Sequence, residues 1–114
     1  MSSTPSSAIA SPQLRVDAGH PAPGTIRLAV AGEVDLATAQ ALHDAMLRVL
    51  SAGSPDVLDI DLAGLTFMNC TGLGVLVDAQ RVAAGKGCRV RLANPRPVVR
   101  RLLEMSGRLG PAAP

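Results

Sequence analysis

Aromatic residues are almost missing from this sequence: Phe67 stands alone, without any Trp or Tyr. Proteins that bind single-stranded nucleic acid stack bases on aromatic side chains, so this composition excludes that mode of binding. The last third of the chain does concentrate arginines, namely Arg89, Arg91, Arg96, Arg100 and Arg101, but no DNA-binding motif accompanies them. We therefore predict no nucleic-acid partner and interpret these arginines as a solvated or partner-facing surface.

Cysteines and long apolar runs are also scarce. Cys70 and Cys88 lack C-x-x-C spacing and have only two histidines as possible imidazole partners, which matches no zinc pattern. No apolar run approaches the roughly 20 residues of a membrane helix. Residues 1–12, rich in Ser, Ala and Pro, lack the basic start and apolar stretch of a secretory signal. We expect a cytoplasmic protein with reduced thiols, without metal, cofactor or membrane partner.

The length of 114 residues is sufficient for one ordinary domain only. Nearly half of the residues are hydrophobic, in short runs separated by Gly, Pro and charged residues, as in globular proteins. We predict a disordered N-terminal tail over residues 1–12, one folded domain over 13–107 and a C-terminal tail over 108–114.

Apolar periodicity predicts the order of elements. Alternation predicts a hairpin through 14–16 and 26–30, with further strands at 57–62 and 88–92. Helical spacing predicts helices over about 36–50, about 70–84 and a third that ends before Gly107, with Leu36, Val98 and Met105 on their inner stripes. This order implies an α/β fold with a mixed, mostly parallel sheet of four to five strands and helices packed against it.

Polar residues mark the predicted helix starts. The side chains of Asp35, Asn69 and Asn94 can each accept hydrogen bonds from the first N–H groups of a helix, and Pro95 suits a first turn. His43 is predicted to lie on the solvent-exposed side of the first helix. Because no Ser-His-Asp or Cys-His set is present, we expect a protein that is not an enzyme.

Three stretches resemble a known family: Gly32–Ala39 (GEVDLATA), Leu65–Leu76 (LTFMNCTGLGVL) and Asn94–Leu103 (NPRPVVRRLL). Their order and spacing resemble the STAS domain of bacterial anti-sigma factor antagonists. The resemblance implies a protein that binds an anti-sigma factor, often also a serine kinase, and so frees a sigma factor for transcription.

The resemblance also implies a phosphorylation switch where the second main helix begins. The family's Asp-Ser-Ser/Thr-Gly stretch corresponds to residues 69–72, so Asn69 replaces the Asp and Cys70 replaces the phosphorylated Ser. Thr71 is the remaining candidate for the residue that accepts the phosphate. The alternative is that its hydroxyl only caps the helix or packs against neighbouring residues. Asn69 also suits an N-cap, and Cys70 also suits a small buried hydrophobe or an oxidisable thiol.

In this family an acidic turn lies beside the switch, which assigns Glu33, Asp35 and Thr38 to a partner-binding surface with Asn69, Cys70, Thr71 and Gly72. A purely structural role for Glu33 and Asp35 is the alternative. Two other functions stay open: a STAS subunit of a stress-sensing or transporter-associated assembly, and a nucleotide or phosphate sensor that uses the helix N-terminus. The short chain after the third helix predicts exposed apolar surface, and hence a homodimer or an obligate partner.

Overall fold

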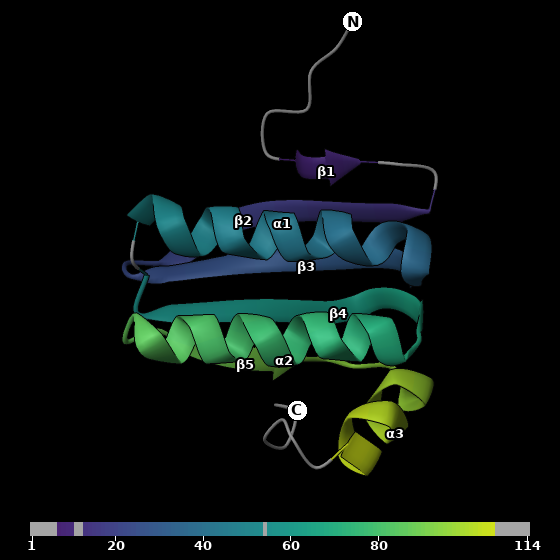
Figure 1. Ribbon diagram of the computed structural model, residues 1–114. Helices are drawn as coiled ribbons and strands as arrows, with labels where there is room; N and C mark the ends of the chain where they lie inside the picture. The colour runs from purple at the N-terminus through teal and green to yellow at the C-terminus, as the bar shows by residue number, and fades with distance from the viewer. Residues whose placement is uncertain (1–6, 11–12, 54, 107–114) are drawn as a thin grey trace, which may run out of the picture.

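A computed structural model describes residues 7–10, 13–53 and 55–106 of the chain. Eight elements follow one another along it (Figure 1): β1 (Ser7–Ala10), β2 (Leu14–Ala22), β3 (Thr25–Val34), α1 (Leu36–Gly53), β4 (Val57–Met68), α2 (Cys70–Gly85), β5 (Arg89–Ala93) and α3 (Pro97–Ser106). The long β4 joins the predicted strand over 57–62 and the apolar segment that follows it into one element.

The strands form one sheet in the order β1-β2-β3-β4-β5. The pairs β1–β2 and β2–β3 are antiparallel, whereas β3–β4 and β4–β5 are parallel, so β2 runs against the other described strands. The predicted α/β fold with a mixed, mostly parallel sheet is therefore confirmed.

The strand β1 lies inside the segment predicted as a disordered tail. It pairs with β2 at the edge of the sheet, with Ile9 opposite Val16 and Ala10 opposite Arg15. Such pairing uses backbone hydrogen bonds, so a short edge strand needs no marked apolar alternation in its sequence. The rest of the two predicted tails, 1–6, 11–12 and 108–114, lies outside the described residues.

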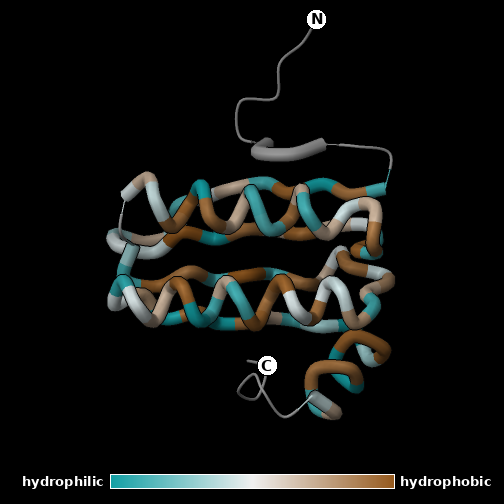
Figure 2. Tube along the Cα trace, viewed as in Figure 1, coloured by the Kyte–Doolittle hydropathy of each residue, from teal (hydrophilic) through white to brown (hydrophobic). Residues whose placement is uncertain are grey.

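The helices α1 and α2 lie side by side on one face of the sheet (Figure 1), each connecting two parallel neighbouring strands. Apolar strand residues are buried in the core, and Figure 2 shows hydrophobic residues recurring along β3 and β4. Burying one such aliphatic side chain stabilises the folded state by roughly 1.5–3 kcal/mol relative to leaving it exposed. They include Leu14, Val16, Leu28, Val30, Leu58, Ile60 and Leu62.

The third helix begins later than the sequence predicted. Asn94 is not its cap: Asn94 has a left-handed φ of 57°, and its side chain donates a hydrogen bond to Asp61. The chain turns at Asn94 because asparagine tolerates this backbone region. The helix α3 starts at Pro97, which takes the first-turn place predicted for Pro95.

Three side chains predicted to point inward are exposed instead: Leu36 by 79%, Val98 by 60% and Met105 by 77%. Val98 and Met105 are seven residues apart, so they share one face of α3, while Val99 fills the inner face. Leu36 is the first residue of α1 and lies at the groove between α1 and α2. The homodimer stays a prediction.

Candidate functional site

The turn between β3 and α1 is held by two reciprocal side-chain caps. The Asp35 carboxylate accepts hydrogen bonds from the N–H groups of Ala37 (2.9 Å) and Thr38 (3.2 Å), so its predicted capping role is confirmed. The Thr38 hydroxyl accepts from the Asp35 N–H (3.0 Å) and donates to the Glu33 carbonyl (2.9 Å). Thr38 is buried and supports the turn from inside, whereas Glu33 is exposed.

The entry to α2 has an equally clear cap. Asn69 has extended backbone angles, and its Oδ1 accepts from the N–H groups of Thr71 (3.0 Å) and Gly72 (3.2 Å). Cys70 and Thr71 are both exposed, so the interpretation of Cys70 as a buried hydrophobe is wrong. The cap leaves the two residues of interest at the surface in the first turn of the helix.

Gly72 is buried and lets α2 approach the sheet closely. A Cβ at this position would lie 2.5 Å from Met68 Cγ and 2.7 Å from Val34 Cγ1. Real Cβ contacts are not this short, so any larger residue would push the helix start away from β3 and β4. Gly72 therefore fixes the position of the first turn of α2 against β3 and β4.

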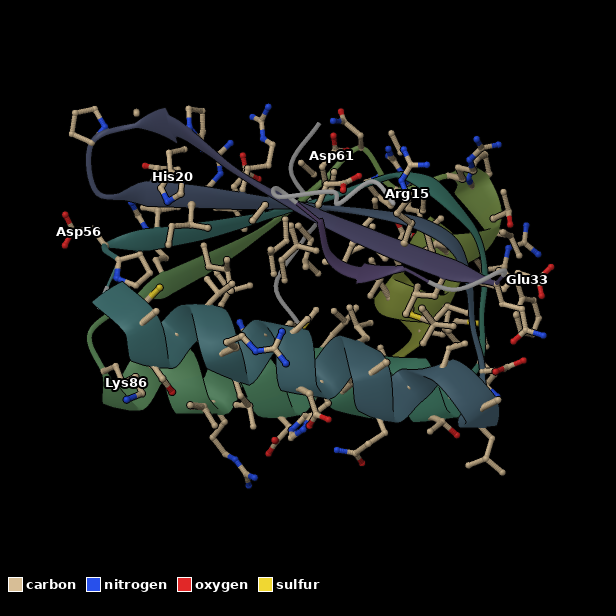
Figure 3. The ribbon with its side chains drawn as sticks, turned by 90° about the horizontal axis from the view of Figure 1, so that it is seen from above. Arg15, His20, Glu33, Asp56, Asp61 and Lys86 are labelled. Atoms are coloured by element: carbon tan, nitrogen blue, oxygen red, sulfur yellow. The ribbon has the colours of Figure 1, made fainter. Side chains whose placement is uncertain are left out.

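The acidic turn and the entry to α2 meet at the carboxyl ends of β3 and β4. Glu33 lies opposite Phe67 in the parallel register, and the Asn69 N–H donates to the Val34 carbonyl at 3.2 Å. Figure 3 shows Glu33 at this end of the molecule and Lys86 at the opposite end. We call the surface formed by Glu33, Asp35, Asn69, Cys70 and Thr71 the switch surface.

Cys70 and Thr71 open onto different grooves. Thr71 borders a groove of about 350 Å³ between α1 and α2, the α1–α2 groove, lined by Leu36, Ala39, Gln40, His43, Thr71, Gly74, Val75 and Asp78. Cys70 borders a groove between α2 and α3, the α2–α3 groove, lined by Cys70, Leu73, Gly74, Val77 and Ser106. One step along the helix, a turn of about 100°, therefore moves a side chain from one groove to the other.

The α1–α2 groove contains an interaction between side chains that the sequence did not indicate. His43 Nε2 lies 2.6 Å from Asp78 Oδ2, and Arg81 donates to Asp78 Oδ1 at 2.7 Å. The His43 side chain is only 24% exposed, so the prediction of a solvent-exposed histidine is wrong. Hydrogen bonds from His43 first, and from Arg81 second, hold the pKa of Asp78 below its ordinary value.

The lowered pKa of Asp78 makes a prediction about stability and pH. The ionised carboxylate stabilises the fold above its unfolded-state pKa, about 3.9, and this contribution is lost as pH falls through the lower folded-state pKa. Asp78→Asn is therefore expected to melt below the wild type at pH 5–7, with a gap that closes below about pH 4. Thermal melts from pH 2 to 7 measure it.

The matched control is Asp44→Asn, because Asp44 is exposed and bonds only Gln40 among the interactions described. Its melting temperature should follow that of the wild type across the range. A gap for Asp78→Asn that is the same at pH 3 and pH 6 would contradict the prediction.

The second thiol lies apart from the switch surface. Cys88 is buried, and this burial raises the pKa of its thiol.

Within residues 7–10, 13–53 and 55–106, no three His, Cys, Asp or Glu side chains gather closely enough to hold a metal ion. In the same ranges, no helix is long and apolar enough to cross a membrane.

Comparison with known proteins agrees with the fold. The family described as "Mlab, STAS domain" matches residues 21–108, most of the chain. An anti-sigma factor antagonist from Mycobacterium paratuberculosis has a crystal structure that is similar with a TM-score of 0.76 and 29% identity over 87% of this chain and 83% of that one. Unphosphorylated SpoIIAA, an anti-sigma factor antagonist, shares the fold with a TM-score of 0.71 at 22% identity over 81% and 80% of the two chains. The chain belongs to the STAS-domain family.

A curated relative narrows this assignment. The anti-sigma-F factor antagonist RsfB of Mycobacterium tuberculosis is 33% identical over 84 residues, which cover 74% of this chain and 67% of RsfB. Within the STAS-domain family, the chain thus groups with the anti-sigma factor antagonists.

Proposed function

We propose that this protein binds an anti-sigma factor through the switch surface and so releases a sigma factor for transcription, acting in the cytoplasm as a binding protein without catalysis of its own. The observation that carries the proposal is the meeting of the acidic turn and the exposed first turn of α2 at one edge of the sheet. Relatives that bear the name anti-sigma factor antagonist support it.

We consider two versions of how this binding is regulated: by phosphorylation of Thr71, or without any phosphorylation. A kinase that phosphorylates hydroxyl groups has no acceptor at Cys70, whereas the exposed Thr71 offers one. In the first version the anti-sigma factor is a serine/threonine kinase and Thr71 takes the phosphate. In the second version the switch is lost and the amount of antagonist alone sets the response.

The test is a binding assay followed by intact-mass analysis. Each anti-sigma factor encoded in the host genome is purified and titrated against the full chain, and one of them is expected to bind with a Kd in the micromolar range or below. Absence of binding by all of them would contradict the proposed function.

The anti-sigma factor that binds is then incubated with the full chain and ATP, and the mass of the chain is measured. A gain of one phosphate that vanishes in Thr71→Ala would support the first version. A phosphate gained only by Cys70→Ser would support the second, because it would show an active kinase that finds no acceptor in the natural chain.

A further inference from the structure

The α1–α2 groove has an apolar interior that is open to the outside. Ala39, Gly74 and Val75 line it, and Leu36 stands at its mouth with 79% of its surface exposed. Among the residues that the structure describes, nothing lies within 4 Å of the position that a Cβ on Gly74 would take, apart from its two chain neighbours and the nearby backbone of its own helix. The groove therefore has room for a side chain that comes from another molecule.

Acidic residues predominate in the two segments that form this groove. The segments 32–47 and 62–80 contain Glu33, Asp35, Asp44 and Asp78 but no Lys or Arg, although the whole chain has a net charge of +2. We call these four acids the acidic rim. The basic residues that directly follow these segments are Arg48 and Arg81, and Arg81 already bonds Asp78. A rim of this kind attracts a basic surface and steers its approach.

We propose that the α1–α2 groove is the anchoring site for the protein partner, an inference that rests on the proposed function. An aliphatic side chain of the anti-sigma factor enters the groove over Gly74, and a basic side chain beside it meets the acidic rim. A buried apolar anchor surrounded by polar contacts is the common arrangement of the energetically dominant part of an interface. Thr71 borders the same groove, so the anchor lies beside the candidate phosphate acceptor.

The charge of the rim also separates this occupant from a second copy of the chain. A symmetric pair of protomers that met through this surface would bring the two acidic rims together. Like charges placed opposite each other across an interface are unfavourable, whereas a basic partner is favoured.

The experiment fills the groove from within. Gly74→Leu adds a side chain into open space, and it replaces a glycine in a helix interior by a good helix former, so the melting temperature is expected not to fall. The probe is the purified anti-sigma factor, measured by titration calorimetry. Gly74→Leu is expected to weaken its binding at least tenfold.

Two further variants make the result specific. Gly85→Leu is the matched control, because Gly85 lies at the other end of α2 and also has open space around it, and its affinity should stay within twofold of the wild type. Gly74 also borders the α2–α3 groove, so Leu36→Ala tests the α1 side alone and should weaken binding at least threefold. Raising NaCl from 0.1 to 0.5 M should weaken the wild-type complex as well.

The outcomes separate the two claims. If the wild type binds an anti-sigma factor and both Gly74→Leu and Leu36→Ala bind it equally well, the anchoring site is wrong and the proposed function stands. If the wild type binds none, both fail. If sedimentation shows a wild-type homodimer that Gly74→Leu dissociates, a second copy occupies the groove and the inference is overturned.

Discussion

Gly32→Ala is expected to destabilise the fold by about 3 kcal/mol or more, a large part of the 5–15 kcal/mol typical of a small domain. Gly32 has a φ of 105°, in a region that residues with a Cβ rarely adopt. A Cβ here would also overlap the Gln13 carbonyl oxygen, a backbone atom that cannot rotate away. Strain and overlap therefore act together.

The close approach at Gly32 also positions the switch surface. The Glu33 N–H donates to the same Gln13 carbonyl at 2.8 Å, and the Thr66 hydroxyl donates to the Gly32 carbonyl at 3.0 Å. Both contacts lie just before the acidic turn. An alanine at position 32 would thus displace the segment that carries Glu33.

Thermal and urea unfolding of Gly32→Ala measure the effect, which corresponds to a fall in Tm of roughly 12 °C or more. Gly53→Ala is the control: Gly53 ends α1 with open space around it and without a left-handed φ, so its Tm should change by only a few degrees. Equal melting temperatures for Gly32→Ala and the wild type would contradict a tight approach of β2 to β3 at this point.

The parts of the site that could be predicted from the sequence are those held by local hydrogen bonds. Asp35 and Asn69 cap N–H groups two and three residues further along the chain, so their neighbours in sequence are also their partners in space. The apolar alternation of β3 and β4 likewise carried the fold class, because each strand buries one face under the helices.

The parts that could not be predicted depend on residues far apart in the chain. His43 reads as a polar helix residue until α2 brings Asp78, 35 positions later, to within 2.6 Å of it. The start of α3 is similar in kind. The pair Asn94-Pro95 has the composition of a helix start, but Asp61 of the neighbouring strand bonds the Asn94 side chain, and the helix begins only at Pro97.

Cys70 and Thr71 are adjacent in the sequence, but their side chains border two different grooves. Cys70, where the resemblance predicts the family's phosphorylated serine, borders the α2–α3 groove, and Thr71 borders the α1–α2 groove. A charge at position 71 therefore acts on a different part of the surface from a charge at position 70. Two single substitutions can distinguish these effects.

Thr71→Glu is expected to weaken anti-sigma factor binding about 100-fold, equivalent to about 2.7 kcal/mol, whereas Cys70→Glu should weaken it less than tenfold. A glutamate at position 71 places a longer, charged side chain at the mouth of the α1–α2 groove, in the path of the aliphatic side chain that we propose enters there. Covering a carboxylate with an aliphatic side chain removes the charge from water, which is costly. A glutamate at position 70 borders the other groove and stays in water.

A loss of folding stability should not account for the difference in affinity between Thr71→Glu and Cys70→Glu. Both positions lie in the first turn of α2, where a negative side chain interacts favourably with the helix dipole, so neither variant should melt lower than the wild type. Thr71→Ala, which removes the hydroxyl without adding charge, should bind within threefold of the wild type. Equal losses for Thr71→Glu and Cys70→Glu would show that the partner covers both grooves, and a larger loss for Cys70→Glu would place its main contact beside α3.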